Sequence, residues 1–175
     1  MSSSTTERAS HQHSADKSGL SAAVLTVSDS CARGERKDLS GPAVVEALQK
    51  AGFQIVATQI VADEQIRIHN ALIEQALRAR LVVTTGGTGI APRDVTPEAT
   101  VAVCDRLLEG VAERMRLEGG KKTKFAALSR GVCGVRGKSL ILNLPGSPAG
   151  AVESLAAVLE LIPHALNLLE GKTEH

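Results

Sequence analysis

Aromatic residues are nearly absent from this sequence of 175 residues, which has two Phe and neither Tyr nor Trp. Proteins that bind nucleic acids commonly stack bases on aromatic side chains and follow the phosphates with a basic stripe. Here the aromatic side chains are missing, the Lys and Arg residues are scattered, and the net charge is +1. We therefore expect no nucleic-acid partner and a core built from Val, Leu, Ile and Ala.

Paired cysteines and long apolar runs are also missing. Cys31, Cys104 and Cys133 are an odd number without a Cys-x-x-Cys pair, so the sequence indicates neither a disulfide framework nor a zinc site. No apolar run approaches ~18 residues, and the N-terminus has no basic-then-apolar signal pattern. The sequence therefore predicts a cytoplasmic protein with no membrane partner.

The first 19 residues are rich in Ser, Thr and His and contain hardly any apolar side chains. Such a segment cannot bury enough surface to fold, so residues 1–19 are predicted to be a disordered tail. Residues 20–175 have the length and the near-average apolar content of one soluble domain.

A short stretch in the middle of the chain changes from a buried strand to a glycine turn. Residues 81–85 are apolar and β-branched, which suits a strand buried on both faces of a parallel sheet. Gly86, Gly87 and Gly89 then free the backbone, because glycine adopts positive φ and has no Cβ to block a ligand. Thr88 adds a hydroxyl. We interpret this turn as a phosphate-binding site.

A carboxylate lies between this turn and the next predicted helix. Thr96 is a candidate N-cap and Pro97 suits the first helical position, which leaves Asp94 just outside the helix. A carboxylate beside a phosphate-binding turn repels the phosphate unless a metal lies between them, so Asp94 suggests Mg²⁺. The alternative is a tight turn in which the glycines serve geometry alone and Asp94 is a surface charge.

Polar residues also follow the first predicted strand. Residues 22–28 form a short buried-strand pattern, and a long polar loop comes after them. Ser28 and Asp29 offer a hydroxyl and a carboxylate at the end of this strand, where ligands of parallel sheets commonly bind. A satisfied turn would use the same two residues.

The strand predicted over residues 138–144 repeats the design of the central stretch. Pro145, Gly146 and Ser147 turn it into the last helix. Two strand-turn-helix units with glycine at the turn place two sets of N–H donors and two helix N-termini at one edge of a sheet.

The other elements follow from the hydrophobic period and from helix breakers. The pattern predicts helices over 40–51, 63–79, 97–108 and 111–117, a strand over 53–61, a hairpin or irregular strand over 125–137, and a last helix over 149–170 interrupted at Pro163. Asp63 opens the second of these helices as an ordinary N-cap candidate. Lys121, Lys122 and Lys124 belong to a solvated loop, or help to hold a phosphate if that loop lies near the site.

Several of these motifs together carry a resemblance. They are Val-Ser-Asp at 27–29, Ser-Gly-Pro at 40–42, Asp-Glu at 63–64, Thr-Gly-Gly-Thr-Gly at 85–89, Pro-Arg-Asp-Val-Thr-Pro-Glu at 92–98, Leu-Ser-Arg at 128–130 and Asn-Leu-Pro-Gly-Ser-Pro at 143–148. In this order and spacing the chain resembles the MogA/MoaB family of molybdenum cofactor biosynthesis over nearly all of its length after the tail.

The resemblance implies an α/β fold, a three-layer α/β/α sandwich with a mostly parallel central sheet, assembled as a homotrimer or a homohexamer. It implies adenylylation of molybdopterin, in which Mg²⁺-bound ATP donates AMP to the terminal phosphate of molybdopterin and pyrophosphate leaves. The substrate phosphate is itself the nucleophile, so such a protein needs only positioning and charge neutralisation. The adenylylated pterin goes on to metal insertion, which makes a molybdenum insertase a candidate partner.

The same resemblance implies roles for individual residues. Asp63 and Asp94 match the two acidic positions associated with activity in the family, as catalytic residues and as Mg²⁺ ligands. The residues expected to bind phosphate or nucleotide, or to line the same pocket, are Ser28, Asp29, Thr85, Gly86, Gly87, Thr88, Gly89, Pro145, Gly146 and Ser147.

Two other functions share these motifs. One is a binding or carrier paralogue that keeps the pocket without efficient catalysis, and retention of Asp63 and Asp94 argues for activity instead. The other is the related domain of molybdenum insertases or of the competence-damage-protein family, whose chains carry large additional domains.

Overall fold

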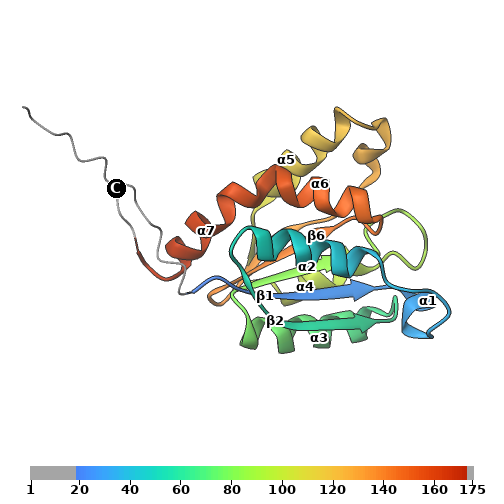
Figure 1. Ribbon diagram of the computed structural model, residues 1–175, viewed down its shortest axis with the longest axis horizontal. Helices are drawn as coiled ribbons and strands as arrows, with labels where there is room; N and C mark the ends of the chain where they lie inside the picture. The colour runs from blue at the N-terminus through green and yellow to red at the C-terminus, as the bar shows by residue number, and fades with distance from the viewer. Residues whose placement is uncertain (1–18, 173–175) are drawn as a thin grey trace, which may run out of the picture.

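The computed structural model describes residues 19–172 and contains one six-stranded sheet (Figure 1). The strands are β1 (Ser21–Val27), β2 (Gln54–Val61), β3 (Leu81–Thr85), β4 (Arg106–Leu107), β5 (Cys133–Arg136) and β6 (Ser139–Leu144), in the spatial order β2-β1-β3-β6-β5-β4. Strands β2, β1, β3 and β6 run parallel, whereas β5 and β4 are antiparallel to their neighbours. The mostly parallel sheet is confirmed, and the predicted tail lies outside the described residues except for Gly19.

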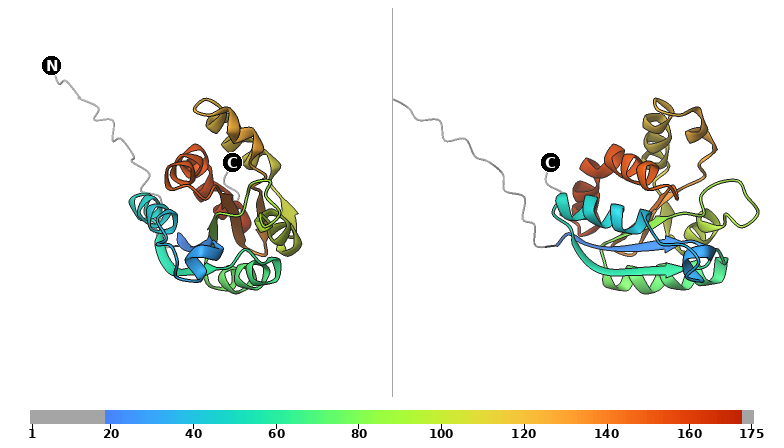
Figure 2. Two further views of the ribbon diagram at one scale, coloured as in Figure 1. Left: turned by 90° about the vertical axis from the view of Figure 1, so that its right-hand side faces the viewer. Right: turned by 45° about the vertical axis from the view of Figure 1, so that its right-hand side comes forward.

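Helices cover both faces of the sheet, which makes the three predicted layers (Figures 1 and 2). The helices are α1 (Asp29–Ala32), α2 (Ser40–Lys50), α3 (Gln65–Arg78), α4 (Thr96–Val103), α5 (Glu109–Gly120), α6 (Pro148–Val158) and α7 (Ile162–Leu169), with short 3₁₀ turns η1 (Lys124–Leu128) and η2 (Leu159–Leu161). Helices α2, α5, α6 and α7 pack on one face and α3 and α4 on the other. The α/β/α sandwich is confirmed.

The central strands are buried on both faces, which explains their continuous apolar sequence. All five residues of β3 and all six of β6 are buried. Alternate side chains enter opposite cores, so that Val83 packs with Leu48 of α2 while Val82 packs with Ile68 of α3. Fully burying a side chain of this size contributes about 1.5–3 kcal/mol, so these strands hold the site in place.

Two sequence predictions for the segment after the glycine turn are wrong. The helix predicted over 97–108 ends at Val103, because Arg106 and Leu107 pair with β5 as the edge strand β4. Thr96 is not an N-cap but lies within α4, and its hydroxyl donates to the carbonyl of Gly86 at 3.0 Å. The side chain therefore fixes the turn instead of the helix end.

The interruption predicted in the last helix is confirmed. The 3₁₀ turn η2 separates α6 from α7, because Pro163 has no N–H to donate to the carbonyl of Leu159. Contrary to the expectation from the sequence, the run Pro148–Leu169 is long and apolar enough to cross a membrane by length and composition. In this fold one stripe of it packs on the sheet, consisting of Ala151, Leu155, Val158, Ile162 and Leu166.

The three cysteines are free thiols. Burial raises the pKa of Cys104 to about 11 and that of Cys133 to about 12. Both thiols therefore stay protonated at neutral pH and are poor nucleophiles.

Candidate functional site

The carboxyl ends of β1, β3 and β6 lie side by side, and a glycine turn follows each of the last two. In register, Thr26 pairs with Thr85, and Thr85 pairs with Leu144. The two turns touch, since a Cβ on Gly146 would lie 3.3 Å from the Cα of Gly86. The Thr85 hydroxyl also donates to the carbonyl of Pro145 at 2.7 Å. The sheet thus joins both predicted turns into one structure.

The glycines of the first turn make room for protein atoms. Gly86 and Gly87 have φ of 98° and 66°, where other residues are strained. A Cβ on Gly86 would lie 2.2 Å from the Val27 carbonyl oxygen, and one on Gly89 would lie 2.7 Å from Oδ2 of Asp94. The alternative in which these glycines serve the geometry of a tight turn is therefore partly correct. Phosphate binding by the turn stays a prediction.

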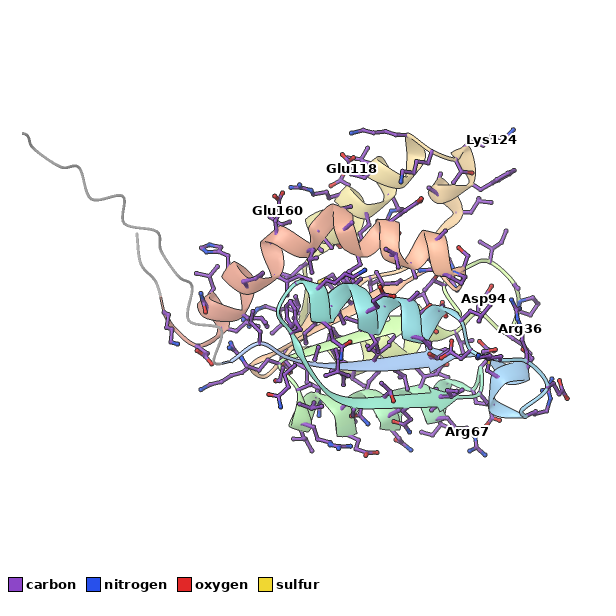
Figure 3. All side chains as sticks on the ribbon, in the orientation of Figure 1. Arg36, Arg67, Asp94, Glu118, Lys124 and Glu160 are labelled. Carbon is purple, nitrogen blue, oxygen red and sulfur yellow. The ribbon has the colours of Figure 1, made fainter. Side chains whose placement is uncertain are left out.

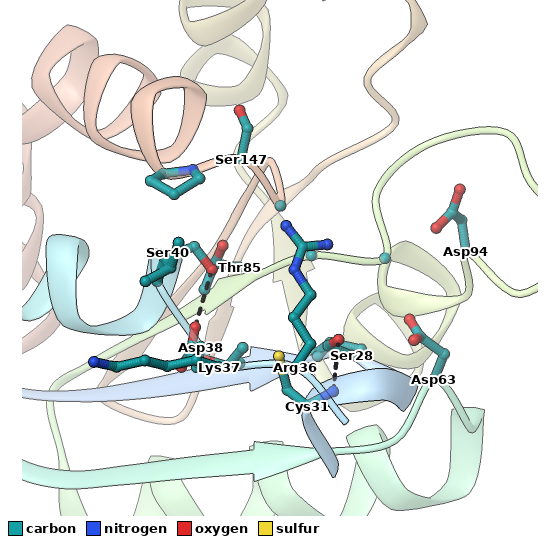
Figure 4. A pocket seen from close by; sticks show the side chains of 17 residues that line it. Ser28, Cys31, Arg36, Lys37, Asp38, Ser40, Asp63, Thr85, Asp94 and Ser147 are labelled. Atoms are coloured by element: carbon teal, nitrogen blue, oxygen red, sulfur yellow. Dashed lines mark hydrogen bonds between the residues drawn. The ribbon is translucent and has the colours of Figure 1, made fainter. Parts of the chain in front are cut away.

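A polar cavity of about 420 Å³ opens at these strand ends (Figure 4). Its wall consists of Thr26, Val27, Ser28, Cys31, Arg36, Lys37, Asp38, Leu39, Ser40, Asp63, Thr85, Gly86, Gly87, Asp94, Gly146, Ser147 and Pro148. Eight of the predicted site residues are in this set, contributed by segments that are far apart in the sequence.

A second cavity of about 570 Å³ adjoins the first and has a more apolar wall. It contains Ile90, Phe125 and Leu128, together with the predicted residues Thr88, Gly89 and Pro145. Four residues line both cavities, namely Gly87, Asp94, Gly146 and Ser147. The structure therefore gathers every predicted site residue except Asp29 around two cavities with a common wall.

Asp29 lies beside the first cavity and not on its wall. The Arg93 guanidinium contacts both oxygens of its carboxylate, with Nε 2.5 Å from Oδ2 and Nη2 2.9 Å from Oδ1. This pairing lowers the pKa of Asp29. The carboxylate also accepts the backbone N–H of Asp63 at 3.0 Å, so it is engaged by the protein.

Asp63 is not an N-cap. Helix α3 begins at Gln65 with Glu64 as its N-cap and no side-chain cap hydrogen bond. The Asp63 carboxylate instead accepts the backbone N–H of Asp29 at 2.8 Å and lines the polar cavity. Burial, followed by the negative charges of Asp29 and Asp94, raises the pKa of Asp63. The interpretation of Asp63 as an ordinary helix N-cap is therefore wrong.

Asp94 is held in a turn that a second arginine fixes. Its Oδ2 accepts the N–H of Ala91 at 2.9 Å, and its carbonyl accepts Nη2 of Arg130 at 2.6 Å. Arg130 also donates from Nε to the carbonyl of Gly89 at 2.7 Å and pairs with Glu98. Asp94 is thus part of an ordered loop that faces both cavities, and not an isolated surface charge.

Arg36 and Lys37 are site residues that the sequence did not single out. Both line the polar cavity, and neither forms an ion pair with any residue of the described range 19–172. Arg36 reaches into the cavity, whereas Lys37 extends away from Asp63 and Asp94 (Figure 4). The available signal was the charged loop that follows the first strand, at the ligand end of the sheet.

Each lysine of the later loop contacts a neighbouring side chain. Lys121 pairs with Glu118 at 2.8 Å and Lys122 with Glu153 at 3.0 Å, and Lys124 lies 5.5 Å from the Phe125 ring centre. Figure 3 shows Lys124 and Glu118 well away from Arg36. The loop itself borders the second cavity through Thr123 and Phe125, so a role of these lysines in holding a phosphate stays a prediction.

The comparisons with known proteins agree with this geometry. Residues 23–164 match the family model described as "Probable molybdopterin binding domain". The chain belongs to this molybdopterin-binding family. The resemblance to the MogA/MoaB proteins is thereby confirmed.

Individual members of the molybdopterin-binding family cover most of the chain. Molybdopterin adenylyltransferase from Helicobacter pylori strain J99 is 45% identical over 152 residues, which are 85% of this chain and 86% of the relative. The enzyme of the same name from Escherichia coli K12 is 38% identical over 165 residues, 85% of this chain and 84% of the relative. The solved structure of the molybdopterin biosynthesis enzyme MoaB from Thermus thermophilus is 54% identical, with a TM-score of 0.82, over 87% of this chain and 98% of that one.

The two predicted metal ligands have the donor chemistry that Mg²⁺ needs. Within residues 19–172, no group of three or more His, Cys, Asp or Glu side chains gathers into a metal cage. Mg²⁺ is usually bound through only one or two carboxylates, with water and substrate phosphates completing its shell. Asp63 and Asp94 provide two carboxylates on the wall of one cavity. They suit an ion whose remaining ligands are water or phosphate oxygens.

Proposed function

We propose that this member of the molybdopterin-binding family is a molybdopterin adenylyltransferase, which transfers AMP from ATP to the terminal phosphate of molybdopterin and releases pyrophosphate. Its place in molybdenum cofactor biosynthesis follows from its relatives. The observation that supports the reaction best is the pair of cavities with one common wall. Two large substrates whose phosphates must meet need such an arrangement.

In the proposed reaction an oxygen of the molybdopterin phosphate attacks the α-phosphorus of ATP. A new P–O bond forms, the bond from the α-phosphorus to the oxygen that bridges to the β-phosphate breaks, and pyrophosphate leaves with that electron pair. No protein nucleophile is required, so the chain must hold both phosphates in line and neutralise their charge. The wall of Gly87, Asp94, Gly146 and Ser147 is where we place this step.

Three kinds of group around the polar cavity would offset the negative charge of the phosphates: a metal ion held by two aspartates, an arginine, and backbone N–H groups. Asp63 and Asp94 would hold Mg²⁺, which when bound offsets negative charge on the triphosphate. Arg36 lies in the same cavity and has the planar guanidinium that suits phosphate oxygens. Backbone N–H groups of the two glycine turns would position the phosphates.

The direct test incubates the purified protein with ATP, Mg²⁺ and molybdopterin and follows pyrophosphate release and the mass of the pterin product. Adenylylated molybdopterin, formed only when all three are present, is the expected result. Tight binding of molybdopterin without any adenylylated product would contradict the proposal and favour a carrier paralogue.

We further propose that the protein works in the cytoplasm as a homotrimer or homohexamer and passes its product to a molybdenum insertase. Apolar side chains exposed on the outer helices support assembly, such as Leu77 at 84% and Ile66 at 63% exposure. An adenylylated pterin is an activated intermediate, so a consuming enzyme must follow.

A further inference from the structure

The loops after β1, β2 and β3 are tied together by one carboxylate. Asp29, at the end of β1, receives both Nε and Nη2 of Arg93 from the loop after β3. Oδ1 of the same carboxylate accepts the backbone N–H of Asp63 in the loop after β2. Because the strands are neighbours in the sheet, the three loops meet at its edge.

This contact is reciprocal and sets the direction of the Asp63 side chain. Oδ2 of Asp63 accepts the backbone N–H of Asp29 at 2.8 Å. Its Oδ1 faces the glycine turn, where a Cβ on Gly87 would lie 3.3 Å away. One oxygen is thus held by the protein, and the other is directed at the turn on the cavity wall.

Arg93 is poorly placed to act as a stability element. Its side chain is 61% exposed, whereas that of Asp29 is 22% exposed. Exposed ion pairs contribute little to stability, because solvent screens them and ordering a long side chain has an entropic cost. Arg93 therefore contributes little to stability. Its two-pronged contact aligns the Asp29 carboxylate, which in turn holds Asp63.

We propose that Arg93 is a positioning residue that acts through Asp29: its guanidinium fixes the Asp29 carboxylate, which in turn holds Asp63 opposite Asp94 before substrates bind. The consequence for catalysis rests on the proposed adenylyl transfer. Arg93 itself does not line either cavity, so it is not assigned a contact with substrate.

The test uses four variants: R93A, R93K, D29N and the double variant R93A/D29N. Residues that orient ligating groups typically contribute roughly 10–100-fold to activity, so R93A and D29N should each lower kcat by about that factor with little change in KM for ATP. The double variant should be no slower than the slower single variant, because both changes break one chain of contacts. R93K keeps the charge but loses the fork and should recover only part of the rate.

The matched control is R67A. Arg67 pairs with Glu64 at 2.9 Å, is 64% exposed and lies toward the same end of the molecule as Arg36 (Figure 3). Removing it takes away an arginine and an exposed ion pair next to Asp63 without touching Asp29. Its kcat should equal that of the wild type.

Amide hydrogen exchange at Asp63 provides a readout that does not depend on the reaction. In R93A the Asp63 amide should exchange faster than in the wild type, while in R67A it should not change. Unchanged protection of this amide in R93A, rate losses that multiply in the double variant, or a rise in KM alone would each overturn the positioning role. If the wild type forms no adenylylated product, the proposed function fails, and the exchange result still decides whether Arg93 holds Asp63.

Discussion

At the scale of single residues, the two neighbouring aspartates Asp29 and Asp63 are held in opposite electrostatic situations. Arg93 stabilises the negative charge of Asp29 and lowers its pKa. Asp63 is partly buried beside two other carboxylates, and this raises its pKa. A group that is costly to ionise in the folded protein is typical of a site that awaits a cation or a substrate.

This difference predicts a pH-dependent effect of D63N on stability. The pKa of Asp63 is raised on folding, so its favourable contribution is present below the unfolded value of 3.8 and is lost as pH rises through the folded pKa. At neutral pH the charged carboxylate therefore destabilises the fold, and D63N should be more stable than the wild type in urea unfolding. The difference in the free energy of unfolding between D63N and the wild type should narrow as the pH falls toward 3.8. A difference that is constant with pH would contradict the electrostatic explanation.

At the scale of elements, the glycine turn after β3 allows close packing against its neighbours and is also a proposed binding surface. Gly86 combines positive φ with a close approach to the Val27 carbonyl, and Thr96 bonds to the Gly86 carbonyl from α4. The turn is therefore fixed by β1 on one side and by α4 on another before any ligand binds.

A comparison of G86A with G137A should separate the cost of positive φ from the cost of the close backbone approach at Gly86. Gly137 also has positive φ, 56°, but nothing lies within 4 Å of a Cβ built on it. G137A should lower the free energy of unfolding by about 1–2 kcal/mol, because only the left-handed conformation is strained. G86A should cost more, since its Cβ would also clash with backbone. Equal losses in chemical unfolding would show that the approach to β1 is unimportant.

The elements differ in how well the sequence predicts them. The strands over 81–85 and 138–144 were predictable, because burial on both faces leaves an apolar run. The two-residue strand β4 was not, since Arg106 and Leu107 have no periodicity and become a strand only by pairing with β5. Asp94 was singled out by its place after the glycine turn, whereas Asp63 became a site residue only through the family motifs. The position of Arg36 depends on how its loop folds back over the cavity, which local sequence does not encode.

At the scale of the whole molecule, large apolar side chains are exposed on several elements, including the two helices on one face of the sheet. Leu77 and Ile66 of α3 and Val101 of α4 are 84%, 63% and 47% exposed. Apolar side chains that a folded chain leaves exposed can be covered by an interface between protein subunits.

The purified protein should therefore be an oligomer with three or six subunits. Multi-angle light scattering at micromolar concentration measures this directly, and symmetric association through repeated apolar patches is the expected cause. L77E should shift the mass toward the monomer if α3 contributes to the interface. A strictly monomeric wild type would contradict the proposed assembly without affecting the proposed reaction.

The most direct test of the proposed chemistry is the rate of pyrophosphate release from ATP, with molybdopterin and Mg²⁺ present, in D63N and D94N. Each variant keeps the shape of the side chain and removes the charge that would hold the cation, so each should lose about 10²–10³-fold in rate. E74Q, which removes an exposed carboxylate on α3, should match the wild type and serves as the control for charge removal. Melting curves establish that the variants are folded. Wild-type rates in folded D63N or folded D94N would contradict the role proposed for that aspartate.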